Sequence, residues 1–260
     1  MFGQKKDKSS KNMEQDAVEI AQCPVCKSVT TLLYYMQNSD TKKRSKWYSC
    51  SCGVVWQTDE PSGKYDRKYY ERYKDGGKKY EEACKYPVYV YAPIIEELVY
   101  SRKMLQIGMN TPYQAEAFRE RGWVTYSIDK NKDFKDSERL IVGDFEERVF
   151  GTSDKYDVVW AYHTIECFSK PIESLSKCLD LLSEGGILFI ATPDTDFINT
   201  RSSGGFIHWQ PEYNRIMWNI RSLSSALERL GFDIVLARRN YEARFPAQDD
   251  LHLIAQKRYF

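Results

Sequence analysis

The sequence has no long apolar run and no excess of charge of one sign. Its apolar runs, such as Ile187–Ala191, are far shorter than the roughly 20 residues of a membrane-spanning helix. The 38 lysines and arginines nearly balance the 37 aspartates and glutamates, for a net charge of +1. This balance argues against a protein held to nucleic acid by overall charge, but not against one that uses a local basic patch. No apolar signal core follows the first residues, so we expect a cytoplasmic protein without membrane attachment.

The seven cysteines are an odd number, which does not indicate a disulfide framework in a reducing compartment. Four of them form two close pairs, Cys23-x2-Cys26 and Cys50-x-Cys52, separated by 23 residues. Two close pairs around a short stranded segment are typical of a four-cysteine zinc site. The alternative is four free thiols, but residues 20–58 then have too few large apolar side chains to fold. We predict a structural zinc ribbon.

The second cysteine pair is one residue shorter than is common in ribbons, and Ser49 stands where its first cysteine is expected. Both thiolates can still converge on one ion from a tighter turn. Because the ribbon is small, we expect it to fold only with metal. The substitution Cys26→Ser is therefore predicted to unfold residues 20–58 and to leave the rest of the chain folded.

Composition divides the chain into four parts. Residues 1–19 are polar and rich in lysine, and we expect a flexible tail. Residues 20–60 form the predicted ribbon. Residues 61–92 hold eight of the 19 tyrosines, and we interpret them as a helical or irregular connecting segment outside the core. Residues 93–260 show the alternation of an α/β domain.

Short apolar segments alternate with amphipathic segments after residue 93. The predicted strands are 103–107, 123–128, 139–142, 156–162, 186–192, 232–237 and 251–257. The predicted helices begin at Pro93, at Pro112 with Thr111 as N-cap, near Ile172 before a stop at Gly185-Gly186, and at Ile220 before a stop at Gly231. This alternation predicts a doubly wound, mostly parallel sheet with helices on both faces.

Ligands of a doubly wound sheet bind beyond the carboxyl ends of its strands. Gln106 and Gly108 end the first strand, and Asp129 ends the second, 21 residues after Gly108. A carboxylate there can accept hydrogen bonds from both hydroxyls of a ribose. After the third strand, Asp144 precedes Phe145, an acid beside a flat ring that is suited to holding and stacking an adenine.

Four segments carry motifs in a characteristic order: the loop within Lys103–Tyr113, the strand and turn Tyr156–Glu166, the segment Leu181–Pro193 with its paired glycines, and Ser222–Val235. Together they resemble the class I S-adenosylmethionine-dependent methyltransferases over residues 93–260. The resemblance implies a Rossmann-like, seven-stranded sheet with an antiparallel last strand. It also implies S-adenosylmethionine as cofactor, held by Gln106, Gly108, Asp129, Asp144 and Phe145.

The N-terminal part of the chain also resembles members of this family. A cysteine-pair ribbon followed by Tyr69-Tyr70-Glu-Arg-Tyr73 is similar to the bacterial and phage subset of these enzymes that carries an N-terminal zinc ribbon. Members of that subset are often associated with sugars, surface glycans or small metabolites. The resemblance therefore implies a small-molecule or glycan acceptor.

The cofactor loop departs from the family pattern acid-x-Gly-x-Gly-x-Gly. This chain has Gln106, Gly108, Asn110 and Pro112 at the four defining positions, so one glycine remains and the acid is an amide. Gly108 still allows close backbone approach, and asparagine tolerates positive φ better than most residues. Gln106 keeps an acceptor for the cofactor's ammonium but loses the charge. We expect a cofactor site that is weakened but not abolished.

Three residues are candidate catalytic groups. His163 follows the fourth strand and, as a general base, would take a proton from an acceptor hydroxyl or amine. The alternative is a structural histidine. Glu166 matches a family position that usually holds the next helical turn near the cofactor. His208 follows Gly204-Gly205, a loop that could close over substrate.

Three functions fit the sequence. The first is methyl transfer to a small acceptor, plausibly a sugar or glycan hydroxyl or a related metabolite. The second is a non-catalytic binding or structural protein on a degenerate methyltransferase fold. The third is a nucleic-acid methyltransferase, which the sequence disfavours because Ala161-Tyr162-His163-Thr164 replaces the Asn/Asp-Pro-Pro-aromatic motif that holds a flipped base. The oligomeric state is not encoded in any feature of the sequence.

Overall fold

The computed structural model describes residues 19–37, 44–61, 63, 71, 77–109, 111–135, 137–197, 210, 212–239 and 250–259. Its centre is a seven-stranded sheet with the order β11-β12-β9-β8-β5-β6-β7. The bounds are β5 (Lys103–Ile107), β6 (Val124–Asp129), β7 (Leu140–Val142), β8 (Tyr156–Tyr162), β9 (Leu182–Pro193), β11 (Phe232–Arg239) and β12 (Asp250–Lys257). Strands β5 to β9 pair in parallel, whereas β12 is antiparallel to both β9 and β11. The predicted mostly parallel sheet with an antiparallel last strand is confirmed.

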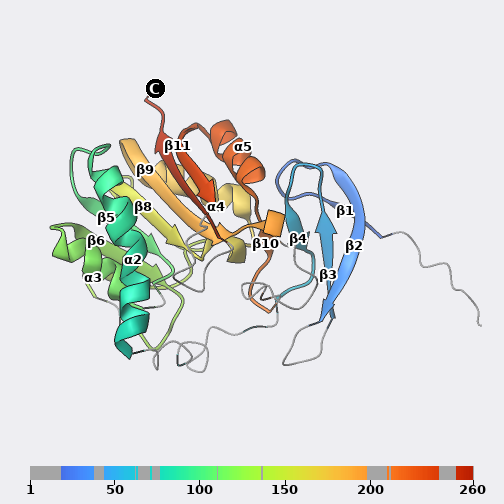
Figure 1. Cartoon of the computed structure of the whole chain (residues 1–260), viewed down its shortest axis with the longest axis horizontal. Coiled ribbons are helices and arrows are strands. Elements are labelled where there is room, and N and C mark those ends of the chain that lie inside the picture. Colours follow the sequence, from blue (N-terminus) through green and yellow to red (C-terminus); the bar gives the residue numbers. More distant parts are fainter. Residues whose placement is uncertain are drawn as a thin grey trace, which may run out of the picture.

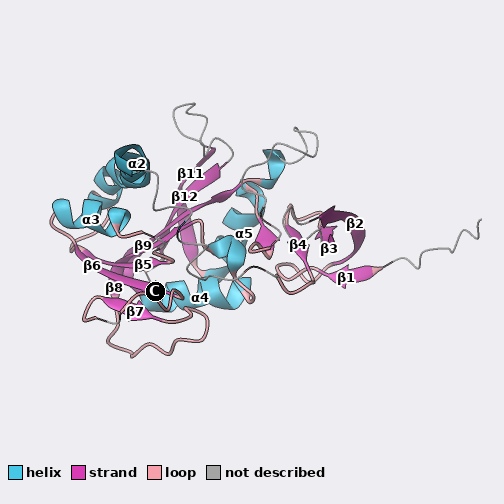
Figure 2. Ribbon diagram, turned by 90° about the horizontal axis from the view of Figure 1, so that it is seen from below, coloured by secondary structure: helices cyan, strands magenta, loops and turns pink. Residues whose placement is uncertain are grey.

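Helices cover both faces of this sheet (Figures 1 and 2). On one face, α2 (Gly77–Glu96) and α3 (Tyr113–Glu120) bury apolar side chains in a cluster with Trp160 and Phe189. On the other face, α4 (Pro171–Leu181) and α5 (Ile220–Leu230) pack over the alternate strand residues, among them Leu188 and Ile190. Successive strand residues point to opposite faces, and both faces are covered by helices. Strand β9 is therefore buried along nearly its whole length.

Helix α2 begins much earlier than the sequence analysis predicted. Pro93 lies in its last turn, not its first, and Val88, Tyr91, Ala92 and Ile95 are buried against the sheet. Their spacing is that of one helical face, so this part of the tyrosine-rich segment belongs to the core, and the prediction of a helix that starts at Pro93 is wrong. No helix in the described ranges is both long enough and apolar enough to cross a membrane.

The other helix ends are closer to expectation. Helix α5 starts with a capping box in which Asn219 Oδ1 accepts from the Ser222 amide, and it ends at Gly231 in the left-handed region, as predicted. Pro112 is the N-cap of α3, where Thr111 was expected. Helix α4 ends at Leu181, and β9 follows directly, so the glycine pair lies inside the strand and does not terminate the helix.

The cysteine pairs lie in a second sheet with the order β1-β2-β3-β4-β10. Its strands are β1 (Ile20–Gln22), β2 (Val29–Gln37), β3 (Arg44–Ser49), β4 (Val55–Gln57) and β10 (Ile216–Met217). The last of these comes from the α/β part, and it lies beside β4 in Figure 1. Residues 1–18 of the predicted tail lie outside the described residues, whereas Glu19 accepts hydrogen bonds from Lys46 and Tyr48.

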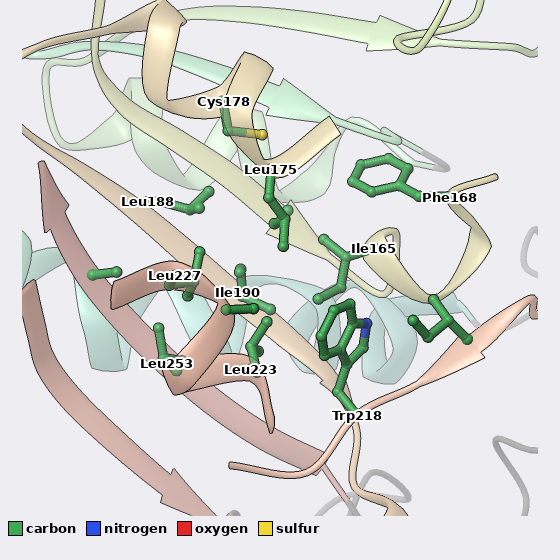
Figure 3. Close-up of a cluster of buried hydrophobic side chains, with 14 of the residues drawn as sticks. Ile165, Phe168, Leu175, Cys178, Leu188, Ile190, Trp218, Leu223, Leu227 and Leu253 are labelled. Atoms are coloured by element: carbon green, nitrogen blue, oxygen red, sulfur yellow. The ribbon is translucent and has the colours of Figure 1, made fainter. Parts of the chain in front are cut away.

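One apolar core runs through both sheets. Cys23, Tyr48 and Trp56 of the ribbon belong to the same buried cluster as the side chains under α4 and α5. Figure 3 shows the α/β side of this cluster, where Trp218 lies beside Ile165. The ribbon is therefore not an independent module, because part of the apolar surface that stabilises it comes from the α/β domain.

Candidate functional site

Four strands of the parallel sheet end at one edge. The register pairs Ile107 with both Ile128 and Ala161, and it pairs Asp129 with Val142. The residues that follow β5, β6, β7 and β8 are therefore neighbours in space. This edge brings together Gly108, Asp129, Asp144, His163 and Glu166, which the sequence analysis selected one by one.

Gly108 needs the conformational freedom of glycine. Its φ is +73°, in the left-handed region, and a Cβ atom there would lie 2.6 Å from Thr164 Oγ1. Thr164 is itself fixed, because its hydroxyl is 2.8 Å from the carbonyl oxygen of Ile107 and donates to it. The turn after β5 therefore packs tightly against the turn after β8, and its backbone is open to close approach by a ligand.

Gln106 is buried and held by side chains on the α3 face of the sheet. Its Nε2 donates to Gln114 Oε1 at 3.1 Å, and the same oxygen accepts from Trp160 Nε1 at 3.0 Å. Gln106 Oε1 is buried and has no hydrogen-bond partner among the described residues. A buried acceptor without a donor costs free energy, so this atom fits a group that brings its own N–H.

Asp129 ends β6 as a buried residue. One carboxylate oxygen accepts from the Asn131 amide at 2.8 Å, which fixes the turn that follows the strand. Asn131 is also buried, at the edge where a ribose is expected. The carboxylate is therefore held in place before any ligand arrives.

The side chains of Asp144 and Phe145 lie in different environments, one at the edge of the sheet and one in the core. Asp144 is partly exposed at the edge, where its carboxylate pairs with Lys130 at 2.8 Å. Phe145 is only 4% exposed, and its ring stacks on Phe168 with centroids 5.8 Å apart. The structure therefore contradicts the expectation that Phe145 stacks on an adenine, because the face of its ring is already covered by the core.

His163 lies between two carboxylates. Its Nε2 is 2.9 Å from Asp250 Oδ2, and its Nδ1 is 3.5 Å from Glu166 Oε1. Burial works against the charged imidazole, but the two carboxylates outweigh it and raise the pKa of His163 well above its ordinary value. The two carboxylates therefore favour the imidazolium form of His163. The predicted role as a general base needs the neutral imidazole and stays a prediction.

Glu166 is buried next to this histidine in a short 3-10 helix, η2 (Ile165–Cys167). Its second carboxylate oxygen accepts from the Thr192 hydroxyl at 2.9 Å, and its backbone carbonyl accepts from the Arg215 amide. His208, the third predicted catalytic residue, lies outside the described residues, as do Gly204-Gly205 and the three tyrosines Tyr69, Tyr70 and Tyr73. The described part of the chain thus joins two of the three predicted groups.

Asp250, Thr164 and Gln114 were missed by the sequence analysis. Asp250 begins β12, and because that strand is antiparallel its first residue lies at the carboxyl edge, opposite Pro193. An antiparallel last strand was predicted, so this placement of Asp250 could have been foreseen. Thr164 and Gln114 carried no comparable signal, since their roles depend on contacts between separate turns and helices.

The four paired cysteines converge as predicted for a metal site. Their sulfur atoms all lie within 4.8 Å of one another, with Cys23 and Cys52 at 3.8 Å and Cys26 and Cys50 at 3.4 Å. A tetrahedron with zinc–sulfur bonds of about 2.3 Å has edges of about 3.8 Å, which matches this spacing. The separations exclude disulfide bonds, which need about 2.05 Å between sulfurs.

The surroundings of these sulfurs also fit a metal. Backbone amides of Val25 and Cys26 donate toward the Cys23 sulfur, as amides do around a thiolate. Burial opposes ionisation of Cys26, but hydrogen bonds from Ser28 outweigh it and lower the pKa of that thiol to about 6. Burial raises the pKa of both Cys23 and Cys52. Four thiolates so close together would need a cation to balance their charge, and the spacing of the sulfurs suits zinc.

The comparisons with known proteins agree with this geometry. A family model described as a methyltransferase domain matches residues 77–237, which is well over half of the chain. The match begins at the first residue of α2. No curated protein sequence matches the chain.

Several solved structures share the fold. The CcbJ methyltransferase from Streptomyces caelestis aligns with a TM-score of 0.54 and 14% identity, over 73% of this chain and 96% of that one. A SAM-dependent methyltransferase from Archaeoglobus fulgidus aligns with a TM-score of 0.53 and 19% identity, over 73% and 98%. At such identities the likeness shows the fold alone, and the family model carries the assignment. The chain therefore belongs to the methyltransferase-domain family and is an S-adenosylmethionine-dependent methyltransferase.

Proposed function

We propose that the chain transfers the methyl group of S-adenosylmethionine to a small acceptor, plausibly a sugar or glycan hydroxyl or a related metabolite group. The observation that carries this proposal is the polar cluster of His163, Glu166 and Asp250 beside the cofactor edge of the sheet. Its carboxylates can accept hydrogen bonds from the several hydroxyls of a sugar. The sequence after β8 also lacks the motif with which base-amino methyltransferases hold a flipped base.

The cofactor would be held by residues at the ends of β5, β6 and β7. Gly108 lets the backbone approach, Gln106 accepts from the ammonium, Asp129 accepts from the ribose hydroxyls, and Asp144 lies where the adenine is expected. The bound cofactor supplies a sulfonium methyl with a good leaving thioether. The main task of the protein is then to align the acceptor with that methyl group.

The charges of His163, Glu166 and Asp250 determine which of these groups can take the proton that the acceptor loses. The flanking carboxylates favour the imidazolium form of His163, and in that form it orients the acceptor and its charge balances the two carboxylates. If His163 does take the acceptor's proton, that requires the neutral imidazole. Transfer would then increase with pH, with an apparent pKa above the ordinary value of histidine. Glu166 and Asp250 are the alternative proton acceptors in this cluster.

The zinc that we propose for Cys23, Cys26, Cys50 and Cys52 has a structural role. Four cysteine ligands complete the tetrahedron and leave no open position for chemistry. The site also lies in the ribbon sheet, apart from the edge where the cofactor residues meet.

Methyl-labelled cofactor and a fractionated cell extract test the acceptor class. We expect label to appear in the small-molecule and glycan fraction, and not in protein or nucleic acid. The control is Asp129→Asn, which keeps the oxygen that accepts from the Asn131 amide but removes one ribose acceptor, and it should lower the signal. Label found in the macromolecular fractions, or cofactor binding without transfer to any fraction, would contradict the proposal.

A further inference from the structure

The substituted cofactor loop is supported by a second set of residues that fixes the direction of the Gln106 amide. Gln106 and Trp160 are register partners on β5 and β8, so their side chains leave the sheet on the same face. Gln114 of α3 lies over both and accepts from each through its single side-chain oxygen. All three side chains are buried, so no exchange with bulk water competes with these bonds.

The direction of each hydrogen bond follows from the indole. Trp160 Nε1 can only donate, so the Gln114 atom that faces it must be the oxygen. That oxygen then requires an N–H from Gln106, which leaves Gln106 Oε1 as an acceptor without a partner among the described residues. The ring of Trp160 is stacked on Phe189 with centroids 3.8 Å apart, so the indole cannot turn away.

We propose that Trp160 and Gln114 are positioning residues that hold the Gln106 carbonyl as an acceptor for the ammonium of S-adenosylmethionine. This inference rests on the proposed cofactor site. Asp129 and Asp144 are the residues proposed for the ribose and the adenine, so the ammonium is the cationic donor left for Gln106. The amide at position 106 therefore fits its surroundings better than the family's acid would. A carboxylate there would face Gln114 Oε1, which is also an acceptor and which Trp160 holds in place.

This arrangement makes an unusual prediction for Gln106→Glu, which restores the family's acid. The introduced carboxylate faces the fixed oxygen of Gln114, so we expect weaker cofactor binding than in the wild type. Adding Trp160→Phe frees Gln114 to turn its NH2 group toward the carboxylate. The double variant should therefore bind better than Gln106→Glu alone, although Trp160→Phe by itself weakens binding.

Calorimetry with S-adenosylhomocysteine and with its analogue that lacks the amino group tests the proposal. We expect the wild type to prefer the amino compound by about tenfold or more, as for a hydrogen bond to a charged group. Trp160→Phe should remove most of this preference. Because both ligands are compared on one variant, a general loss of stability cancels from the ratio.

Trp123→Phe is the matched control. Its indole nitrogen donates to Glu96 at 3.0 Å, and its ring packs on Phe118, as the ring of Trp160 does. This variant should keep the full preference. The positioning role is overturned if Trp160→Phe keeps the preference too, or if Gln106→Glu binds more tightly than the wild type. Failure of the wild type to bind either ligand would contradict the proposed cofactor site itself.

Discussion

At the scale of single residues, Gly108 is a position where even a methyl side chain should be costly. We expect Gly108→Ala to weaken S-adenosylhomocysteine binding at least tenfold, because alanine resists a φ of +73° by about 1–2 kcal/mol and its Cβ would collide with Thr164. Gly143→Ala is the control, since Gly143 lies at the same edge and a Cβ there meets nothing within 4 Å. Calorimetry should show equal affinity for the control and the wild type. Equal affinity for Gly108→Ala would contradict the account of this turn.

His163 gives a prediction about pH. Its folded pKa is raised, so its ion pairs stabilise the protein fully below the unfolded pKa of about 6.5, and this stabilisation is lost as pH rises through the folded pKa. His163→Asn tolerates the left-handed backbone at this position, where φ is 49°, and leaves two buried carboxylates without their cation. We expect it to cost about 3 kcal/mol near neutral pH.

Denaturant unfolding at several pH values measures this effect. The difference in unfolding free energy between wild type and His163→Asn should be largest below about pH 6.5 and should narrow as pH rises above it. A difference that stays constant from pH 6 to 10 would show that His163 is not held as an imidazolium.

At the scale of elements, the start of α4 depends on a residue outside the helix. Glu146 accepts from the amides of Ser169 and Lys170 and from the hydroxyls of Ser169 and Ser174. Burial works against the carboxylate, but these four donors outweigh it and lower the pKa of Glu146. The stabilisation is therefore present above the unfolded pKa of about 4.3 and is lost as pH falls through the folded pKa.

We expect Glu146→Gln to lower the unfolding free energy by about 1–2 kcal/mol at pH 7, because an amide replaces a charged acceptor of several hydrogen bonds. The matched control is Glu147→Gln, an exposed neighbour that should change little. The loss should shrink when both proteins are measured near pH 3. If Glu146→Gln and Glu147→Gln behave alike at pH 7, the capping role of Glu146 is wrong.

At this scale, the sequence predicted the strands of the α/β domain well. Short apolar segments between polar turns leave little choice about where each strand begins and ends. Residues 156–162 and 220–230 match β8 and α5 at both ends. It failed for α2, where lysines and tyrosines obscured the buried face of Val88, Tyr91, Ala92 and Ile95. A tyrosine can be a core residue or a surface residue, and packing against the sheet decides which.

At the scale of the whole molecule, the shared core changes what metal loss should do. The sequence alone predicted that Cys26→Ser would unfold only the ribbon. The structure places the ribbon's Trp56 in the same apolar cluster as Trp218, and pairs β4 with β10. Such contacts join residues more than 150 positions apart, and no local pattern in the sequence reveals them.

We therefore expect Cys26→Ser, or removal of zinc by a chelator, to lower the melting temperature of the α/β domain as well as the ribbon. Near-ultraviolet circular dichroism should show one coupled transition at a lower temperature. Cys84→Ser is the control, since Cys84 lies on α2 outside the cysteine cluster. Elemental analysis should find about one zinc per wild-type chain. An unchanged α/β transition after zinc loss would show that the two parts fold independently.

The site was partly predictable for the same reason as the sheet. The positions of Gly108, Asp129 and Glu166 follow from strand ends alone, because parallel strands bring their carboxyl ends to one edge. The raised pKa of His163 and the burial of Phe145 were not predictable, since each depends on side chains from distant segments, Asp250 in one case and Phe168 in the other.

The central claim is that this edge of the sheet binds S-adenosylmethionine, and isothermal titration with S-adenosylhomocysteine tests it most directly. The account predicts one site per chain and a loss of at least tenfold in affinity for Asp129→Asn, which lacks one of the ribose acceptors. Asp133→Asn, an exposed neighbour in the same turn, should bind as the wild type does. No binding by the wild type at millimolar ligand, or equal affinity for all three proteins, would contradict the account.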